Sequence, residues 1–195
     1  MVTPVQIRPK AKEIYLDCNA TTPVLPYITQ AVKHVMEHVF GNPSSSHITG
    51  LQARYILEST RRLGRQVIGA PTGRLFFTSG ATEGIQTGVL SALTAARHHT
   101  HQGERRWLLY GATEHKAVPQ ALAHWNQLLQ LNAELKAIPV DSHGKLDLDF
   151  IAAHVGAAHM ICTLAVKNET GVRQDLRALK QVIRAHNPTV PWMVD

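Results

Sequence analysis

The sequence has few cysteines and no long apolar run, and both absences limit what the chain can be. Its two cysteines, Cys18 and Cys162, lie far apart without the spacing of a metal site. The start of the sequence does not resemble a secretion signal, so we expect a reduced, cytoplasmic protein. No apolar run approaches the length that spans a membrane, so we expect no membrane partner.

A nucleic-acid-reading motif is also absent, although the formal net charge is +6. The basic residues are scattered, and the only adjacent arginine pairs are Arg61-Arg62 and Arg105-Arg106. We therefore expect no nucleic-acid partner. With 195 residues, of which 44% are hydrophobic, the chain is long and apolar enough for a globular domain with a core.

Two groups of histidines raise the question of a metal site. His34 and His38 are four residues apart on an expected helix but lack a third ligand. The cluster His98-His99-Thr100-His101 falls in an expected loop without further residues at ligand spacing. Solvated histidines explain both groups more simply, so we expect no metal.

The N-terminal part of the sequence predicts an arm followed by two helices. Residues 1–13 are irregular, residues 14–17 form an expected short strand, and helices are expected at about 24–40 and 50–68. We expect two regions, an N-terminal arm with its short strand at 1–22 and a partial large domain at 23–195.

From residue 75 onwards, short apolar runs alternate with amphipathic stretches of helix length. Such alternation predicts repeated crossovers and a mainly parallel sheet, hence an α/β fold. Expected strands cover 75–78, 107–110, 135–140, 160–166 and 191–194, and expected helices cover roughly 81–97, 116–130, 147–155 and 175–186.

The stretch Thr78-Ser79-Gly80-Ala81-Thr82-Glu83-Gly84 joins the first of these strands to a helix. The first amides of a helix have no partner within it and attract anions, phosphate above all. A capped helix start with nothing bound explains the same residues, since Thr78, Ser79 and Thr82 are all plausible caps. On this stretch alone the two interpretations are about equal.

Other polar clusters follow the later strands, and ligands of such sheets bind beyond the carboxyl ends of the strands. His115 follows the second strand, Asn168 the fourth, and Asp195 the fifth. With the helix start to hold a phosphate, His115 could stack on a flat ring, Asn168 could hydrogen-bond a ring substituent, and Asp195 could pair with a protonated ring nitrogen. These are the parts of a pyridoxal-phosphate site.

The chain resembles the N-terminal half of a cysteine desulfurase, in the class V aminotransferase family of fold-type I pyridoxal-phosphate enzymes. Matching segments occur in family order over almost the whole chain. They are Tyr15-Leu16-Asp17, Asn19-Ala20-Thr21-Thr22-Pro23, Phe40-Gly41-Asn42-Pro43-Ser44-Ser45 with His47 and Gly50, Phe77 to Glu83, Thr113-Glu114-His115-Lys116-Ala117-Val118, Asn168-Glu169-Thr170-Gly171 and Val194-Asp195.

The resemblance implies the cofactor pyridoxal 5′-phosphate (PLP) and a role for each candidate residue. Ala81 and Thr82 would belong to the phosphate cradle, His115 would stack on the pyridine ring as the catalytic residue, Asn168 would contact the ring hydroxyl side, and Asp195 would meet the ring nitrogen. Cys18 is expected to be a reduced bystander rather than the sulfur acceptor.

The resemblance also implies a reaction and its partners. L-cysteine would lose its sulfur to a protein cysteine as persulfide and leave as L-alanine, and the sulfur would go to iron–sulfur cluster assembly or transfer-RNA thiolation. A homodimer and a sulfur-acceptor protein are the expected partners. Alternatives are another class V aminotransferase or lyase, and a non-catalytic fragment that binds a partner.

The family's Schiff-base lysine lies beyond the position of Asp195, so activity of this chain alone is in doubt. Lys116 matches a different family segment and is not expected to replace that lysine. The implied fold is a three-layer α-β-α transferase large domain with about five of seven strands. The strand at 75–78 would then have an open edge, and we expect the isolated chain to be unstable or prone to aggregation.

Overall fold

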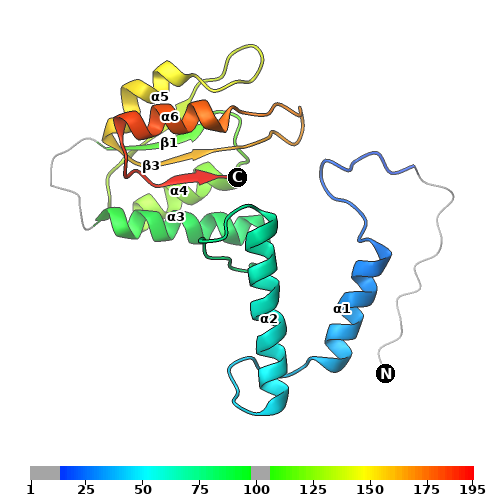
Figure 1. The fold of residues 1–195 in the computed structure, drawn as a ribbon. Helices are drawn as coiled ribbons and strands as arrows, with labels where there is room; N and C mark the ends of the chain where they lie inside the picture. The colour runs from blue at the N-terminus through cyan, green and yellow to red at the C-terminus, as the bar shows by residue number, and fades with distance from the viewer. Residues whose placement is uncertain (1–13, 98–105) are drawn as a thin grey trace. The chain divides into compact units, whose positions relative to one another are not determined.

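The computed structural model describes residues 14–97 and 106–195 (Figure 1). The chain divides into two compact units, Met1–Phe76 and Phe77–Asp195, and each is described here by itself. The sequence predicts an N-terminal arm at 1–22 and a partial large domain at 23–195. The two compact units do not test that division, which stays a prediction.

The first unit contains two helices, α1 (Pro26–His38) and α2 (Ile48–Val67). Pro26 opens α1, where the ring's fixed φ suits the first turn and its missing N–H costs nothing. His47 caps α2, because its Nδ1 accepts the Gly50 amide at 3.3 Å. Both helices lie within about two residues of the predicted ranges. The apolar residues of α1, such as Val32 at 53% exposure, are not buried within this unit.

The short strand expected at 14–17 is not formed. Residues 14–17 have no sheet partner in the part of the chain that the structure describes. A turn follows in which the Asp17 carbonyl accepts the Ala20 amide at 3.1 Å. Tyr15 Oη donates to the same Asp17 carbonyl at 2.9 Å and to that of Thr21 at 3.0 Å. Local hydrogen bonds, rather than those of a neighbouring strand, therefore pair backbone groups of this segment.

The strand expected at 75–78 is also absent. The division between the two units falls between Phe76 and Phe77, which are 72% and 55% exposed. A short apolar run becomes a strand only when another strand accepts and donates its backbone hydrogen bonds. Within the described residues no strand pairs with this one, so the prediction from the apolar run was wrong here.

The second unit is built around a four-stranded parallel sheet. Its strands are β1 (Trp107–Gly111), β2 (Glu134–Ile138), β3 (Ala158–Thr163) and β4 (Trp192–Val194), in the order β2-β1-β3-β4. Leu108 pairs with Leu135 on one side and with Met160 on the other, and Cys162 pairs with Met193. The four strands predicted after residue 100 are thus confirmed, with ends that differ by a few residues.

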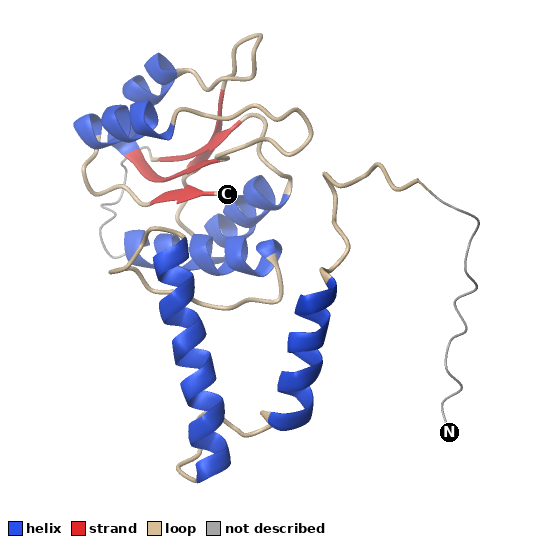
Figure 2. Ribbon diagram, turned by 45° about the vertical axis from the view of Figure 1, so that its right-hand side comes forward, coloured by secondary structure: helices blue, strands red, loops and turns tan. Residues whose placement is uncertain are grey.

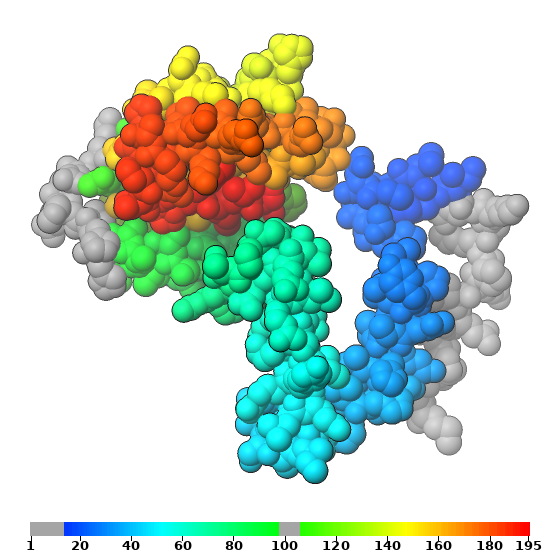
Figure 3. All heavy atoms as spheres, viewed as in Figure 1, coloured from blue at the N-terminus to red at the C-terminus, as the bar shows by residue number. Residues whose placement is uncertain are grey.

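Helices cover both faces of this sheet and give three layers (Figures 1 and 2). Helices α3 (Ala81–Arg97) and α4 (Ala117–Leu128) pack on one face. On the other face lie α5 (Leu148–His154), the 3-10 turn η1 (Val155–Ala157) and α6 (Leu176–His186). In the space-filling view α6 and β4 lie next to each other on the visible face of this unit (Figure 3). The predicted α-β-α layering with a parallel sheet is confirmed, with four strands rather than five among the described residues.

The two cores meet at β3, whose six residues are all buried. Met160 and Cys162 face the helices α3 and α4, while Ile161 faces α5 and α6. A strand that is covered on both faces has a continuous run of apolar residues in its sequence. This run is why the strand could be predicted from the sequence.

We predict that Leu122→Ala lowers the free energy of unfolding of the second unit by about 2–5 kcal/mol, because Leu122 is fully buried in the α3–α4 core. Leu128→Ala is the matched control in the same helix, since Leu128 is 58% exposed. Urea denaturation followed by circular dichroism measures both. Equal losses in the two variants would contradict the packing described here.

Candidate functional site

The carboxyl ends of β1, β3 and β4 meet at one edge of the sheet, and helix α3 begins at the same end (Figure 1). Helix α3 lies close to β4, since a Cβ on Gly88 would lie 3.6 Å from the Met193 sulfur. We call this edge, with the residues that follow the three strands and the first turn of α3, the carboxyl edge. It holds the predicted residues Ala81, Thr82, His115, Asn168 and Asp195.

The first turn of α3 presents unpaired amides. Its first helical hydrogen bond runs from the Gly84 amide to the Gly80 carbonyl at 3.2 Å, so the amides of Ala81, Thr82 and Glu83 have no acceptor within the helix. Ala81 and Thr82 are exposed. These amides and the positive end of the helix dipole can receive an anion.

Glu83 closes the turn that precedes this helix. Its Oε2 accepts the Ser79 hydroxyl and the Ser79 amide, each at 2.6 Å. The hydroxyl hydrogen bond, and then the amide one, hold the pKa of Glu83 below its usual value. The carboxylate satisfies Ser79 and leaves the next amides available, and its own charge is screened by the water around it.

His115 occupies the turn after β1 and is exposed. Its Nδ1 accepts the Ala117 amide at 3.2 Å, and its carbonyl accepts the Val118 amide at 2.9 Å. The ring is therefore held against the start of α4. An exposed ring held in this way can stack on a flat ligand.

Glu114, the residue before His115, is half-buried and reaches across to the neighbouring strand. Its Oε1 accepts the Leu164 amide at 2.5 Å, immediately beyond β3. Its Oε2 is buried without a hydrogen-bond partner among the described residues. Burial raises the pKa of Glu114 to about 7 against the opposing Leu164 hydrogen bond, Asp195 raises it further, and Lys167 lowers it. Glu114 therefore exchanges a proton near neutral pH.

Asp195 continues the pairing of β4 with β3. Its amide donates to the Thr163 carbonyl at 3.0 Å, and its carbonyl accepts the Ala165 amide at 2.8 Å. The backbone of Asp195 is thus tied to the strand end that Glu114 holds. Beside them, Cys162 is fully buried, and burial followed by the charges of Glu114 and Asp195 raises the pKa of its thiol far above its usual value. Cys162 is therefore a neutral core residue and not a nucleophile.

Asn168 lies at the tip of a hairpin that projects from the end of β3. The Lys167 amide donates to the Val172 carbonyl at 2.9 Å, and the Gly171 amide donates to the Lys167 carbonyl at 2.8 Å. Gly171 has φ +74°, which favours glycine in this turn. Lys167 pairs with Glu169 at 3.1 Å. Asn168 is exposed and belongs to the same edge.

Glu114 is the residue of this edge whose role the sequence did not suggest. The sequence offered one signal, a carboxylate in the polar cluster that follows the second expected strand. Gln86 accepts the Trp125 indole N–H at 2.6 Å and so joins α3 to α4.

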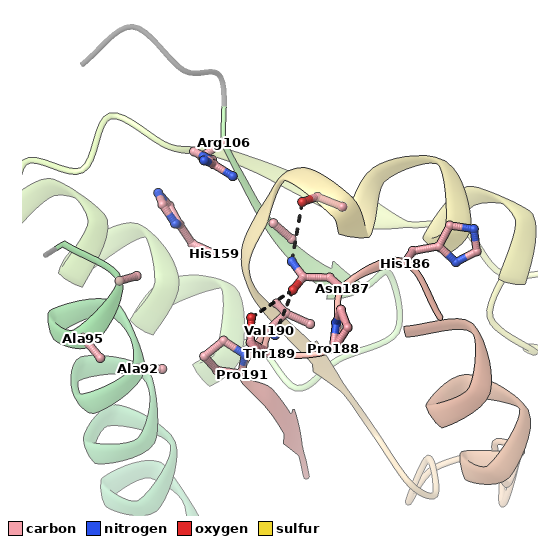
Figure 4. A pocket seen from close by; sticks show the side chains of 13 residues that line it. Ala92, Ala95, Arg106, His159, His186, Asn187, Pro188, Thr189, Val190 and Pro191 are labelled. Carbon is pink, nitrogen blue, oxygen red and sulfur yellow. Dashed lines mark hydrogen bonds between the residues drawn. The ribbon is translucent and has the colours of Figure 1, made fainter. Parts of the chain in front are cut away.

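A cavity of about 680 Å³ lies at the opposite end of the sheet, near the amino ends of β3 and β4 (Figure 4). Arg106 and His159 lie on one side of it, and Asn187 lies on the other. Asn187 serves the fold there, since its Oδ1 accepts the Val190 amide at 3.0 Å. The cavity is remote from the carboxyl edge and from the residues predicted to bind a cofactor.

In the described ranges, 14–97 and 106–195, no three histidine, cysteine or acidic side chains gather as a metal site would require. His34 and His38 stack on each other, with ring centroids 4.5 Å apart. The cluster at 98–101 lies outside the described residues. None of the described helices is long and apolar enough to cross a membrane.

The fold is that of a known family. The chain belongs to the class V aminotransferases, whose family profile matches residues 14–195. Members of this family depend on PLP.

Individual relatives narrow the comparison. A cysteine desulfurase of Frankia sp. (strain EuIK1) is 34% identical over 88% of this chain and 41% of its own length. Selenocysteine lyase of Rattus norvegicus is 29% identical over 92% of this chain and 44% of its own length. The structure of a NifS-like protein superposes with a TM-score of 0.76 and 26% identity, over 91% of this chain and 47% of that one. The chain spans less than half the length of the relatives it matches.

We predict that Glu114→Gln becomes more stable relative to the unsubstituted chain as the pH rises. The folded chain binds the Glu114 proton more tightly than the unfolded chain. The contribution of Glu114 to the free energy of unfolding is therefore largest below pH 4.5 and is lost as the pH rises to about 7. Because glutamine cannot ionise, the Glu114→Gln variant does not lose this stability as the pH rises.

Urea denaturation of both proteins at pH 5, 6, 7 and 8 measures the difference. Glu134→Gln, on the exposed start of β2, is the control and should show no such trend. A difference between Glu114→Gln and the unsubstituted chain that does not change with pH would contradict the raised pKa.

Proposed function

We propose that this chain supplies the first part of the cofactor-binding half of a PLP-dependent cysteine desulfurase. The enzyme would convert L-cysteine to L-alanine and pass the sulfur to a protein cysteine as persulfide, for iron–sulfur cluster assembly or transfer-RNA thiolation. The observation that carries the proposal is the meeting of the α3 start, the His115 turn and Asp195 at one sheet edge. A cytoplasmic location, a homodimer and a sulfur-acceptor protein belong to the same proposal.

The donors and acceptors at the carboxyl edge fit PLP. The unpaired amides of Ala81 and Thr82 suit its phosphate, and the exposed ring of His115 offers a face to its pyridine ring. Asp195 offers a carboxylate for the ring nitrogen, and Asn168 offers an amide for the ring hydroxyl. When bound, PLP supplies an electron sink for bonds broken at the substrate's carbon atoms.

Each residue has a separate task in this proposal. Asp195 would hold a proton on the ring nitrogen, since a carboxylate beside that nitrogen favours its charged form. His115 would fix the tilt of the ring and exclude water from its face, while the hydrogen bond from the Ala117 amide holds the imidazole in place. Ala81 and Thr82 would anchor the phosphate end.

Another class V lyase or aminotransferase is the second candidate. The similarity to selenocysteine lyase favours it, and the contacts proposed here for phosphate and ring serve several reactions. A non-catalytic fragment that binds a partner protein is the third. An assay that compares alanine formation from L-cysteine with transamination of other amino acids separates the first two candidates. PLP binding separates both from the third.

We predict that the chain binds PLP and that Asp195→Asn weakens this binding about tenfold or more, because a charge-assisted hydrogen bond is worth about 1.5–3 kcal/mol. Equilibrium dialysis with PLP alone measures the affinity. Asp149→Asn, in an exposed position on α5, is the control and should bind PLP as the unsubstituted chain does. Identical affinities for both variants would remove Asp195 from the site.

We further predict that borohydride treatment of the chain with PLP traps no stoichiometric adduct on Lys116 or Lys167. Lys116 is exposed at the start of α4, and Lys167 is paired with Glu169. Peptide mass spectrometry measures the adducts. A full adduct on either lysine would place the covalent anchor of the cofactor in this part of the chain.

A further inference from the structure

Glu114 links the two strand ends that carry the proposed cofactor contacts. The residue belongs to the turn after β1, directly before His115, and its Oε1 accepts the amide of Leu164 beyond β3 at 2.5 Å. One residue further on, the Ala165 amide donates to the Asp195 carbonyl at 2.8 Å. The side chain of Glu114 therefore completes a continuous set of hydrogen bonds that runs from the His115 turn to Asp195.

The surroundings of the second oxygen favour an uncharged carboxyl group. Oε2 is buried, and no donor among the described residues reaches it. The groups that act on Glu114 are the Asp195 charge after β4, the Lys167 charge after β3 and the Leu164 amide. Lys167 shares its charge with Glu169, which weakens its pull on Glu114. A proton on Oε2 removes a buried charge that would otherwise lie beside Asp195.

We propose that Glu114 is a positioning residue of the cofactor site, whose side chain fastens the His115 turn to the end of β3, where the backbone of Asp195 is also paired. The proposal rests on the proposed PLP site. It assigns Glu114 no contact with substrate or cofactor. Its task is to hold His115 and Asp195 at a fixed separation.

Gly111 gives an independent way to move this carboxyl group. A Cβ at position 111 would lie 2.9 Å from Glu114 Oε1 and 3.1 Å from a Leu146 methyl group. Glu114 would have to leave its position, while its chemical nature would be unchanged. Gly111→Ala therefore tests the position of the side chain separately from its charge.

The first test measures amide hydrogen exchange in the full chain without PLP. We expect Glu114→Ala and Gly111→Ala to speed exchange at least tenfold at the amides of Leu164, Ala165 and Asp195, and to leave the β2 amides unchanged. Glu114→Gln should keep slow exchange, because its side-chain oxygen can still accept the Leu164 amide. Glu134→Ala is the control. Unchanged exchange in Glu114→Ala, or fast exchange in Glu114→Gln, would overturn the proposal.

The second test measures PLP affinity of the same variants at pH 6.5. We expect Glu114→Gln to match the unsubstituted chain within about twofold, and Glu114→Ala and Gly111→Ala to bind at least fivefold more weakly. Equal affinity in all four proteins would overturn the positioning role. If the unsubstituted chain binds no PLP, the proposed function fails, whereas the exchange experiment still decides whether Glu114 holds the two strand ends together.

Discussion

The structure of the second unit depends on the burial of β3 between two layers of helices. All six of its residues are buried, and its backbone pairs with β1 on one side and β4 on the other. Side chains must alternate between the two faces of a strand, so Met160 and Ile161 anchor different cores. Because β1 and β4 run parallel to β3, their carboxyl ends share one edge. The positions of His115, Asn168 and Asp195, which follow these strands, result from this arrangement.

The carboxyl edge shows how few interactions are needed to assemble polar groups from distant parts of a chain. The parallel pairing brings Asp195 to the end of β3 through two backbone hydrogen bonds. The Glu114 side chain then joins the turn after β1 to the same place. The α3 amides need no specific contact to be available, since every helix leaves its first amides unpaired. Strand pairing, one side chain and a helix start are therefore enough to gather these polar groups at one edge of the sheet.

Features that depend on neighbouring residues in the sequence were predictable, and features that depend on distant ones were not. Helix α3 was predicted at its observed bounds, because its apolar spacing and the small residues before it are local signals. The prediction of a strand at 75–78 was wrong, because an apolar run does not show whether another strand is available to pair with it. The candidate residues could be placed at one edge from strand order alone. The raised pKa of Glu114 could not be foreseen, because it arises from burial and from Asp195, 81 positions further along the chain.

The distribution of aromatic residues gives the two units different spectroscopic properties. All three tryptophans, Trp107, Trp125 and Trp192, belong to the second unit, whereas Tyr15, Tyr27 and Tyr55 belong to the first. Trp125 donates to Gln86 across the α3–α4 contact, and Trp192 donates to Thr163 Oγ1 at 2.8 Å. Light emitted on excitation at 295 nm, where only indole absorbs, would therefore follow the melting of the sheet and its helices. Neither α1 nor α2 contains a tryptophan, so neither helix has such a reporter of its own.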